Sequence, residues 1–389
     1  MNVTGYAYPW DTLDDDAAAS MAAELGLDAV ALAANYHATR VVTPLHPTRR
    51  VLDVPHSAAF FPIRPDAWRD ERLKPRAADW MPSNDAFNDA ARRFEAVGVP
   101  VLAWIVATHE DDFGAANPEV VVRNAFGEPY PYALCPSNDD VRSYCGTLVE
   151  EALSTTSANG VVLEACGAVG LDHGSLHDKS DMAALTDAER WLLSLCFCRA
   201  CHVELSNAGL NPLALAATVR DALSGPIASM ESALGENLVQ RLASFRTGVS
   251  GRLQRELTER VHAVRSDASV TIHASASPWA TGSFPALGEP TDVAALTGVV
   301  ANCWNQATAD RELAQMKLRI GQKARLGAYI RADRVHGDPT ETIERYRQLG
   351  MDELHLYHLG LFNRASLDVA RELAAECHRA QDARATYNP

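Results

Sequence analysis

The stretch at 160–174, GVVLEACGAVGLDHG, holds an apolar run that ends on a carboxylate, Glu164. Three aliphatic residues precede this glutamate, so we expect it at the edge of an apolar core, where burial raises the pKa of a carboxyl group. A carboxyl group that keeps its proton near neutral pH can act as a general acid. The alternative is a structural salt bridge, in which Glu164 only stabilises the fold.

The elements around Glu164 follow a regular alternation of short apolar runs and longer segments with helical period. This alternation is typical of βα units around a parallel sheet. Eight strands are expected, at 3–8, 29–34, 99–107, 160–164, 269–274, 297–302, 324–330 and 353–358, with a closing helix at 364–379. The sequence therefore predicts the α/β class and a (β/α)8 TIM barrel.

Two connections are much longer than ordinary ones. We expect a loop insertion at about 35–85, after strand two, and a helical insertion at about 167–268, after strand four. The 389 residues are then one barrel domain, 1–389, although two domains are an alternative at this length. The aromatic loop at 56–80 is either a lid over the site or a cluster packed on itself.

Polar and aromatic residues recur where the predicted strands end, which is where loops of such barrels meet around an active site. Rings, amides and imidazoles of this kind suit a neutral polyhydroxylated ligand, because sugar faces stack on rings and hydroxyl groups form hydrogen bonds. The expected substrate-binding residues are Tyr8, Trp10, Asn35, Tyr36, His37, Trp104, His109, Asp172, His173, His273, Trp304, Arg331, Tyr357 and His358.

Cleavage of a glycosidic bond usually needs a second carboxylate, about 5–5.5 Å from the first for retention and about 6.5–9.5 Å for inversion. Asp333, in YIRADR after strand seven, is nearest to the expected place. Glu110 and Asp111 after strand three, and Asp172, are the alternatives. Sequence spacing does not choose among them.

Several segments of the first 205 residues carry a resemblance to a known group: ANYHATR followed by PLHPTRRV, LCPSNDDVRSY at 134–144, VVLEACG, and LCFCRAC at 195–201. In the pattern and order of these segments the chain resembles the TIM-barrel glycoside hydrolases, and more closely a group of glycoside-hydrolase-like barrel proteins. The resemblance implies that Glu164 is the acid/base residue at the end of strand four. Leu163 stands where that superfamily usually has asparagine, and the usual glutamate of strand seven is missing. An inverting enzyme, an unusual nucleophile and a different reaction therefore stay open.

Two other functions remain alternatives. His37, His109, His173, His273 and His358 lie near strand ends, so a metal-dependent sugar hydrolase, isomerase or epimerase is the main rival enzyme. A barrel that binds carbohydrate without catalysis is the other. The sequence has no P-loop, no G-x-S-x-G and no G-x-G-x-x-G after the first strand, so we expect no cofactor.

Cys196, Cys198 and Cys201 form a C-x-C-x-x-C cluster with His202 beside it. Three interpretations stay open: buried packing cysteines, a structural zinc site that takes a fourth ligand from elsewhere, and redox chemistry.

Composition limits the partners. The net charge of −15 repels nucleic acid and anionic membranes, and the basic residues at 311–334 alternate with apolar ones as on a solvated helix face. The chain shows neither a long apolar run nor a signal peptide, and its eight cysteines fit a reducing compartment. We expect a cytoplasmic protein that binds a small-molecule or oligosaccharide substrate and that can form a homo-oligomer.

Overall fold

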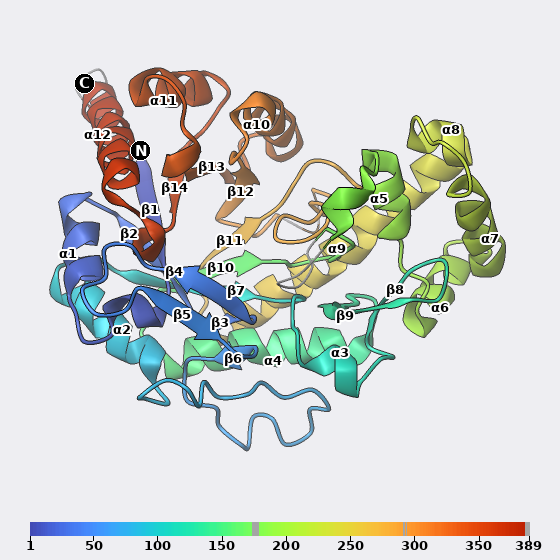
Figure 1. The fold of residues 1–389 in the computed structure, drawn as a ribbon, viewed down its shortest axis with the longest axis horizontal. Coiled ribbons are helices and arrows are strands. Elements are labelled where there is room, and N and C mark those ends of the chain that lie inside the picture. The colour runs from blue at the N-terminus through green and yellow to red at the C-terminus, as the bar shows by residue number, and fades with distance from the viewer. Residues whose placement is uncertain (173–178, 291, 293, 386–389) are drawn as a thin grey trace.

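A closed barrel of parallel strands forms the centre of the computed structural model, which describes residues 1–172, 179–290, 292 and 294–385 (Figure 1). Within these residues the barrel runs in the order β1, β2, β7, β10, β11, β12, β13, β14 and back to β1. The strands are β1 (Asn2–Ala7), β2 (Ala29–Ala33), β7 (Val101–Val106), β10 (Gly160–Glu164), β11 (Ser269–His273), β12 (Gly298–Asn302), β13 (Arg325–Arg331) and β14 (Glu353–Tyr357).

Each of the eight predicted strands overlaps one of these barrel strands, so the predicted (β/α)8 fold is confirmed. The prediction succeeds because strands buried on both faces read as short, nearly continuous apolar runs. Side chains inside the barrel follow the two-residue period of a strand. At Gly327 a Cβ atom would lie 2.7 Å from Cδ2 of His355, so the missing side chain makes room for this imidazole inside the barrel.

Helices follow the barrel strands and surround them (Figure 1). They are α1 (Ala17–Glu24), α2 (Ala86–Ala96), α4 (Asp139–Thr155), α9 (Glu236–Val264), α10 (Gln306–Ile320), α11 (Pro339–Gln348) and α12 (Arg364–Ala385). Asn138, Asn305 and Asp338 cap three of them through side-chain oxygens that accept backbone N–H groups, as N-cap residues do. No helix of the described ranges is both long and apolar enough to cross a membrane.

The loop after β2 contains two small antiparallel pairs, β3 (Asn35–Tyr36) with β6 (Ala58–Ala59) and β4 (Thr39–Val42) with β5 (Val51–Val54). Phe60, Phe61 and Trp68 of this loop are buried, and Trp80 is half-buried. Trp68 contacts Tyr144 of α4 with ring centroids 5.7 Å apart. The loop therefore packs against the barrel's outer layer and is not a cluster packed on itself alone.

The interval after β10 contains η2 (Ser180–Ala183), α5 (Asp187–Leu193), α6 (Arg199–Asn207), α7 (Pro212–Ala222) and α8 (Met230–Leu234) before α9 begins. Helices α5 to α8 share a small apolar core with the first turns of α9, and this core includes Leu192, Val219 and Leu242. Further along the chain, α9 packs on α4, where Arg260 pairs with Glu150 at 3.0 Å. The predicted helical insertion thus includes one of the barrel's own outer helices.

A third elaborated loop, which the sequence did not predict, follows β7. It contains α3 (Phe113–Ala116) and an antiparallel hairpin of β8 (Val121–Arg123) and β9 (Pro129–Leu134). The remaining short helices are η1 (Pro9–Thr12), η3 (Ala332–Arg334) and η4 (Leu359–Leu361), which follow β1, β13 and β14. All of these segments lie at the carboxyl ends of barrel strands, where the candidate site is.

Candidate active site

Glu164 is the last residue of β10 and is only 5% exposed. The indole N–H of Trp104, on the neighbouring strand β7, donates to Glu164 Oε2 at 2.8 Å. Burial raises the pKa of Glu164 to about 7, although hydrogen bonds from Ser283 and Trp104 act in the opposite direction. The carboxyl group can therefore hold a proton close to neutral pH.

A chain of buried polar groups begins at Glu164 and continues through the barrel interior. His273 Nδ1 lies 3.6 Å from Glu164 Oε2, and His273 Nε2 shares a 2.7 Å hydrogen bond with the hydroxyl of Tyr6. Tyr6 also contacts His355 Nδ1 at 3.1 Å, and His355 Nε2 lies 3.7 Å from Glu353. Burial lowers the pKa of His273 far below its ordinary value, so this imidazole is neutral beside Glu164.

Aromatic rings from β1, β7 and β14 pack together beside Glu164. Tyr8 stacks on Trp10, with ring centroids 4.3 Å apart, and on Trp104, at 5.6 Å. His358 lies 4.0 Å from Tyr8, and Tyr36 meets Trp104 edge-on at 5.1 Å. Trp10 is buried between Tyr8 and the loop residue Phe60, so it supports the cluster from behind.

A second group of rings lies at the ends of β12, β13 and β14. Trp304 stacks on Tyr329, with centroids 5.7 Å apart, and contacts Tyr357 at 5.1 Å. The guanidinium of Arg331 lies 5.4 Å from the centre of the Trp304 ring. The hydroxyl groups of Tyr357 and Tyr8 are 3.3 Å apart, so the two groups of rings meet. Trp304, Tyr357 and Arg331 are half-buried, so part of each side chain is exposed to solvent.

The candidate second carboxylates have different surroundings. Asp333 forms a two-point ion pair with Arg331, at 3.0 and 2.6 Å, and this contact lowers the pKa of Asp333. Glu110 is buried, accepts the backbone N–H of Asp112 at 3.0 Å, and has a pKa raised to about 8 by burial. Asp111 accepts the backbone N–H of Ala38 at 2.8 Å. Asp333 is thus paired with the arginine that lies over the Trp304 ring, whereas Asp111 contacts the loop after β2.

His37, His109 and Asp111 come together in one group. The ring centroids of His37 and His109 are 4.0 Å apart, and one ligand atom from each of the three residues lies within 4.8 Å of the others. Burial lowers the pKa of His37 to about 4, so its imidazole is neutral at physiological pH, as a metal ligand must be. Two imidazoles and a carboxylate form a donor set that suits a divalent transition metal.

Other predicted residues have structural contacts. Asn35 bridges β2 and β7 by exchanging hydrogen bonds with the backbone of Val106, at 2.8 and 3.0 Å. Asp172 forms an ion pair with Arg190 of α5. His173 lies outside the described residues.

Tyr6 and Asp11 lie near the end of the first predicted strand and are strand-end candidates in the sequence, without an assigned role. The sequence does not indicate four other groups that contact the site: Tyr329, Phe284, Ser283 and His355. Tyr329 lies two residues before the predicted site residue Arg331, so the two-residue period of a strand would have indicated it. Phe284, which stacks on His273 at 4.6 Å, lies in an irregular loop and gave no such signal.

The arrangement combines a protonatable carboxyl, a neutral imidazole and a set of aromatic side chains, of which Trp304 and Tyr357 are half-buried. Such a site can donate a proton to an oxygen of a bound molecule and hold an apolar or sugar face against aromatic rings. Burial is the main cause that raises the pKa values of Tyr36 and Tyr357, and the negative charge of Glu164 raises them further. Both hydroxyl groups therefore stay protonated and can donate hydrogen bonds.

No model of a known protein family matches the sequence, and no curated protein is significantly similar to it. Among solved structures, the glycoside hydrolase domain of PgaB (BpsB) from Bordetella bronchiseptica matches with a TM-score of 0.59 and 14% identity, over 96% of this chain and 99% of that domain. The catalytic domain of a β-amylase from Paenibacillus polymyxa matches with a TM-score of 0.54 and 10% identity, over 97% and 98% of the two chains. An α-L-fucosidase, isoenzyme 2 from Paenibacillus thiaminolyticus, matches with a TM-score of 0.58 and 10% identity over 98% of this chain. The chain spans half of that fucosidase, 50% of its length. The expected resemblance is confirmed at the level of the fold: the chain has the (β/α)8 barrel that these glycoside hydrolases also have.

Proposed function

We propose that the protein hydrolyses a glycosidic bond in a neutral saccharide or glycoconjugate, with Glu164 as the proton donor. One observation carries the proposal: Glu164 lies at the end of a barrel strand, and burial there raises the pKa of its carboxyl group to about 7. Transfer of its proton to the glycosidic oxygen lets the C–O bond break while the leaving group departs as an alcohol. The solved structures with the same fold make this class of reaction the natural one to test.

The aromatic residues support a saccharide as substrate. Tyr357 and Trp304 contact each other and are both half-buried. His37, which stacks on Tyr36, is half-buried as well. We assign the sugar contacts to these side chains, with Arg331 over the Trp304 ring. The proposal places the reaction in the cytoplasm, where the eight free thiols of the chain stay reduced.

For the second carboxylate we propose Asp333, with Asp111 and Glu110 as alternatives. Asp333 is held ionised by Arg331, which is the state that a general base or a nucleophile needs. Its partner Arg331 lies over the ring of Trp304, where we expect the substrate. Glu110 has the opposite property, because burial favours its protonated form.

The test is a panel of aryl glycosides with the wild-type chain and with Glu164→Gln, Asp333→Asn and Asp111→Asn. Loss of general acid catalysis costs about 10²–10⁴-fold in rate. We therefore expect Glu164→Gln to hydrolyse the best substrate at least about 100-fold more slowly than the wild type. The matched control is Asp368→Asn, which removes a carboxylate that pairs with Arg371 on the surface of α12. Full activity of Glu164→Gln on every substrate that the wild type cleaves would refute the proposal.

A second candidate function is metal-dependent sugar chemistry at His37, His109 and Asp111, which the closeness of their ligand atoms favours. In that case activity is lost with a chelator and restored by a divalent ion. His37→Ala then abolishes the restored activity while Glu164→Gln keeps most of it, which is the reverse of the result expected for glycosidase chemistry.

A further inference from the structure

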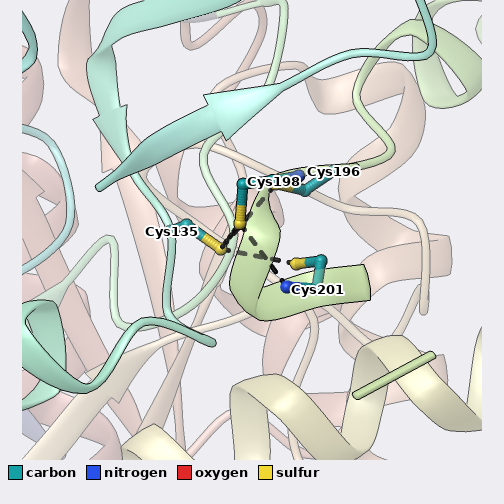
Figure 2. A group of neighbouring side chains, drawn as sticks. All are labelled: Cys135, Cys196, Cys198 and Cys201. Atoms are coloured by element: carbon teal, nitrogen blue, oxygen red, sulfur yellow. Dashed lines mark hydrogen bonds between the residues drawn. The ribbon is translucent and has the colours of Figure 1, made fainter. Parts of the chain in front are cut away.

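Four cysteine side chains come together at the join between the β8–β9 hairpin and the helical insertion (Figure 2). Cys196, Cys198 and Cys201 lie between α5 and the first turn of α6, and the fourth, Cys135, directly follows β9. The sulfur of Cys135 lies 3.5 Å from that of Cys201, 3.7 Å from that of Cys196 and 3.5 Å from that of Cys198. The fourth member thus comes from a segment 61 residues away from Cys196 along the chain.

The spacing of the sulfurs matches one coordination geometry. A zinc ion binds thiolates at about 2.3 Å in a tetrahedron, and the sulfurs at its corners are then about 3.8 Å apart. The observed separations of 3.5–3.7 Å are close to this value. A disulfide would require about 2.05 Å, and all eight cysteines of the chain are free thiols.

Backbone N–H groups point at the sulfurs. The N–H of Arg123 donates to Cys196 Sγ at 3.4 Å, that of Cys198 to the same sulfur at 3.5 Å, and that of Cys201 to Cys198 Sγ at 3.5 Å. Cys198 is also the N-cap residue of α6, where the helix dipole favours a negative charge. These donors stabilise thiolates, which are the form that binds a metal.

A buried cation balances the negative charge of the cluster. Arg246 is only 8% exposed and donates to the backbone carbonyls of Pro278, Trp279 and Ala280. Burial lowers the pKa of Arg246 to about 10, while the negative charges of Cys201 and Cys196 favour its charged form. Four thiolates around Zn²⁺ carry a net charge of −2, and Arg246 offsets part of it.

We propose that Cys135, Cys196, Cys198 and Cys201 bind one structural zinc ion. Four protein ligands close the coordination sphere, so the ion has no open position for a substrate and acts on the fold. The proposal takes up the zinc interpretation of the C-x-C-x-x-C sequence, because Cys135 supplies the fourth ligand that this interpretation needs. The donor set of soft thiolates selects zinc over calcium, magnesium and manganese.

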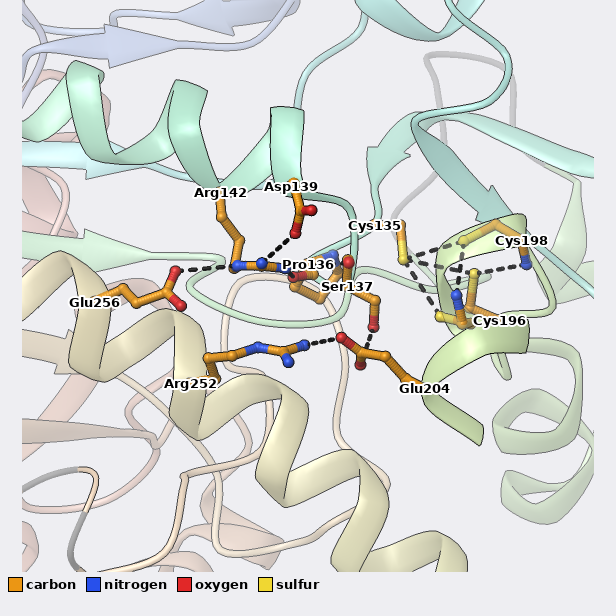
Figure 3. A network of polar contacts seen from close by, with 11 residues as sticks. Cys135, Pro136, Ser137, Asp139, Arg142, Cys196, Cys198, Glu204, Arg252 and Glu256 are labelled. Atoms are coloured by element: carbon orange, nitrogen blue, oxygen red, sulfur yellow. Dashed lines mark hydrogen bonds and ion pairs between the residues drawn. The ribbon is translucent and has the colours of Figure 1, made fainter. Parts of the chain in front are cut away.

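The zinc ion would join three parts of the molecule that polar contacts also connect (Figure 3). Ser137, two residues after Cys135, donates to Glu204 of α6 at 2.9 Å, and Glu204 pairs with Arg252 of α9. Arg142 of α4 donates to the carbonyl of Ser137 at 3.1 Å and pairs with Glu256 of α9 at 3.1 Å. The ion therefore fixes the segment after β9 where α4, α6 and α9 meet.

Through β9 the zinc site also reaches the candidate active site. The carbonyl of Tyr132 accepts the N–H of Glu110 at 3.0 Å, and the N–H of Leu134 donates to the carbonyl of Thr108 at 2.9 Å. His109 forms a bridge with Ala133 of the same strand. The strand that directly precedes the proposed zinc ligand Cys135 thus holds the loop that carries His109, Glu110 and Asp111.

The test begins with the metal content of the wild-type chain, purified under reducing conditions and measured by plasma mass spectrometry. We expect one zinc ion per chain, and a cobalt-loaded sample with the strong thiolate-to-metal absorption of a tetrahedral site. Cys135→Ser and Cys198→Ser should retain only a small fraction of the zinc and should unfold at a lower temperature. The matched control is Cys303→Ser, which alters a buried cysteine outside the cluster and should keep the full zinc content.

The wild-type result alone decides the matter if a variant fails to fold. A metal-free wild-type chain that does not take up zinc or cobalt, with four thiols that titrate freely, would overturn the proposal. Iron in place of zinc, or two disulfides found by mass spectrometry, would overturn it as well. None of these readouts depends on glycosidase activity, so the zinc proposal and the proposed function fail independently.

Discussion

Glu164 is subject to two opposing influences on its proton. Burial at the end of β10 disfavours the carboxylate, whereas the N–H of Trp104 and the hydroxyl of Ser283 stabilise it. Burial is the larger influence, and the resulting pKa of about 7 lies close to physiological pH. A general acid is most effective when its pKa is near the working pH. The balance between the two influences is therefore what a mutation can shift.

Trp104→Phe should move the alkaline limb of the pH profile to higher pH. The substitution keeps an aromatic ring but removes the N–H that donates to Glu164 Oε2, so the charged form loses a stabilising contact and the pKa of Glu164 rises further. A hydrogen bond to a charged group is worth about 1.5–3 kcal/mol, which corresponds to roughly one to two pH units. The pH dependence of kcat/KM on an aryl glycoside measures the shift. An alkaline limb that stays in place in the variant would mean that another group donates the proton.

At the scale of elements, the loop after β2 contributes to stability through its aromatic residues. Phe60 is 1% exposed and packs edge-on against Trp10 and Trp80, at 5.5 and 6.0 Å between ring centroids. This loop therefore forms part of the core that supports the site.

Phe60→Ala should lower the free energy of unfolding by about 3–5 kcal/mol, the usual cost of removing a buried aromatic ring. Phe126→Ala is the matched control, because Phe126 is 51% exposed at the turn of the β8–β9 hairpin and its loss should cost less than about 0.5 kcal/mol. Urea unfolding of the three chains measures both values. Equal stability of the two variants would show that the loop packs loosely and would restore its interpretation as a lid.

The barrel strands could be predicted from sequence because each depends on a local pattern. The run at 160–164 is apolar and short, and its predicted ends coincide with those of β10. The β8–β9 hairpin could not be predicted in this way, since β8 has three residues and β9 contains two prolines. Its contacts with residues 108–110 after β7 depend on tertiary structure.

The candidate site, like the fold, could be predicted only where it depends on local sequence patterns. Strand ends located Glu164, Trp104, Tyr357 and His358 at the correct end of the barrel, because parallel strands share the direction of their carboxyl ends. The buried contacts of Tyr6 with His273 and His355 join residues far apart in the sequence, so no local pattern indicates them. The fourth cysteine of the cluster, Cys135, was missed for the same reason.

At the scale of the whole molecule, the site gathers buried groups that all favour their uncharged forms. Burial raises the pKa of Asp11 to about 7, of Glu164 to about 7 and of Glu110 to about 8. Burial also lowers the pKa of His37 to about 4, and those of His273 and His358 far below their ordinary value. The pH dependence of stability must reflect both sets.

The two sets act in different pH windows. The carboxyl groups contribute stability that is fully present below their unfolded pKa values of 3.8 and 4.5 and is lost as the pH rises through about 7–8. The histidines contribute stability that is present above their unfolded value of 6.5 and is lost as the pH falls. Between these unfolded values the two trends oppose each other. Above 6.5 the histidines are neutral in both the folded and the unfolded state, so only the carboxyl groups still change.

The free energy of unfolding should therefore fall as the pH rises from about 6.5 to about 8, by at most about 1.4 kcal/mol per pH unit for each carboxyl group. Glu110→Gln should reduce the slope most at the upper end of this range, because Glu110 has the highest pKa of the three and its amide replacement cannot ionise. Urea unfolding at several pH values measures the slope, and Asp368→Asn, on the surface of α12, should leave it unchanged. A slope that is the same in wild type and Glu110→Gln would mean that Glu110 ionises in the folded protein as readily as in the unfolded chain, and the loop after β7 would then be open to water.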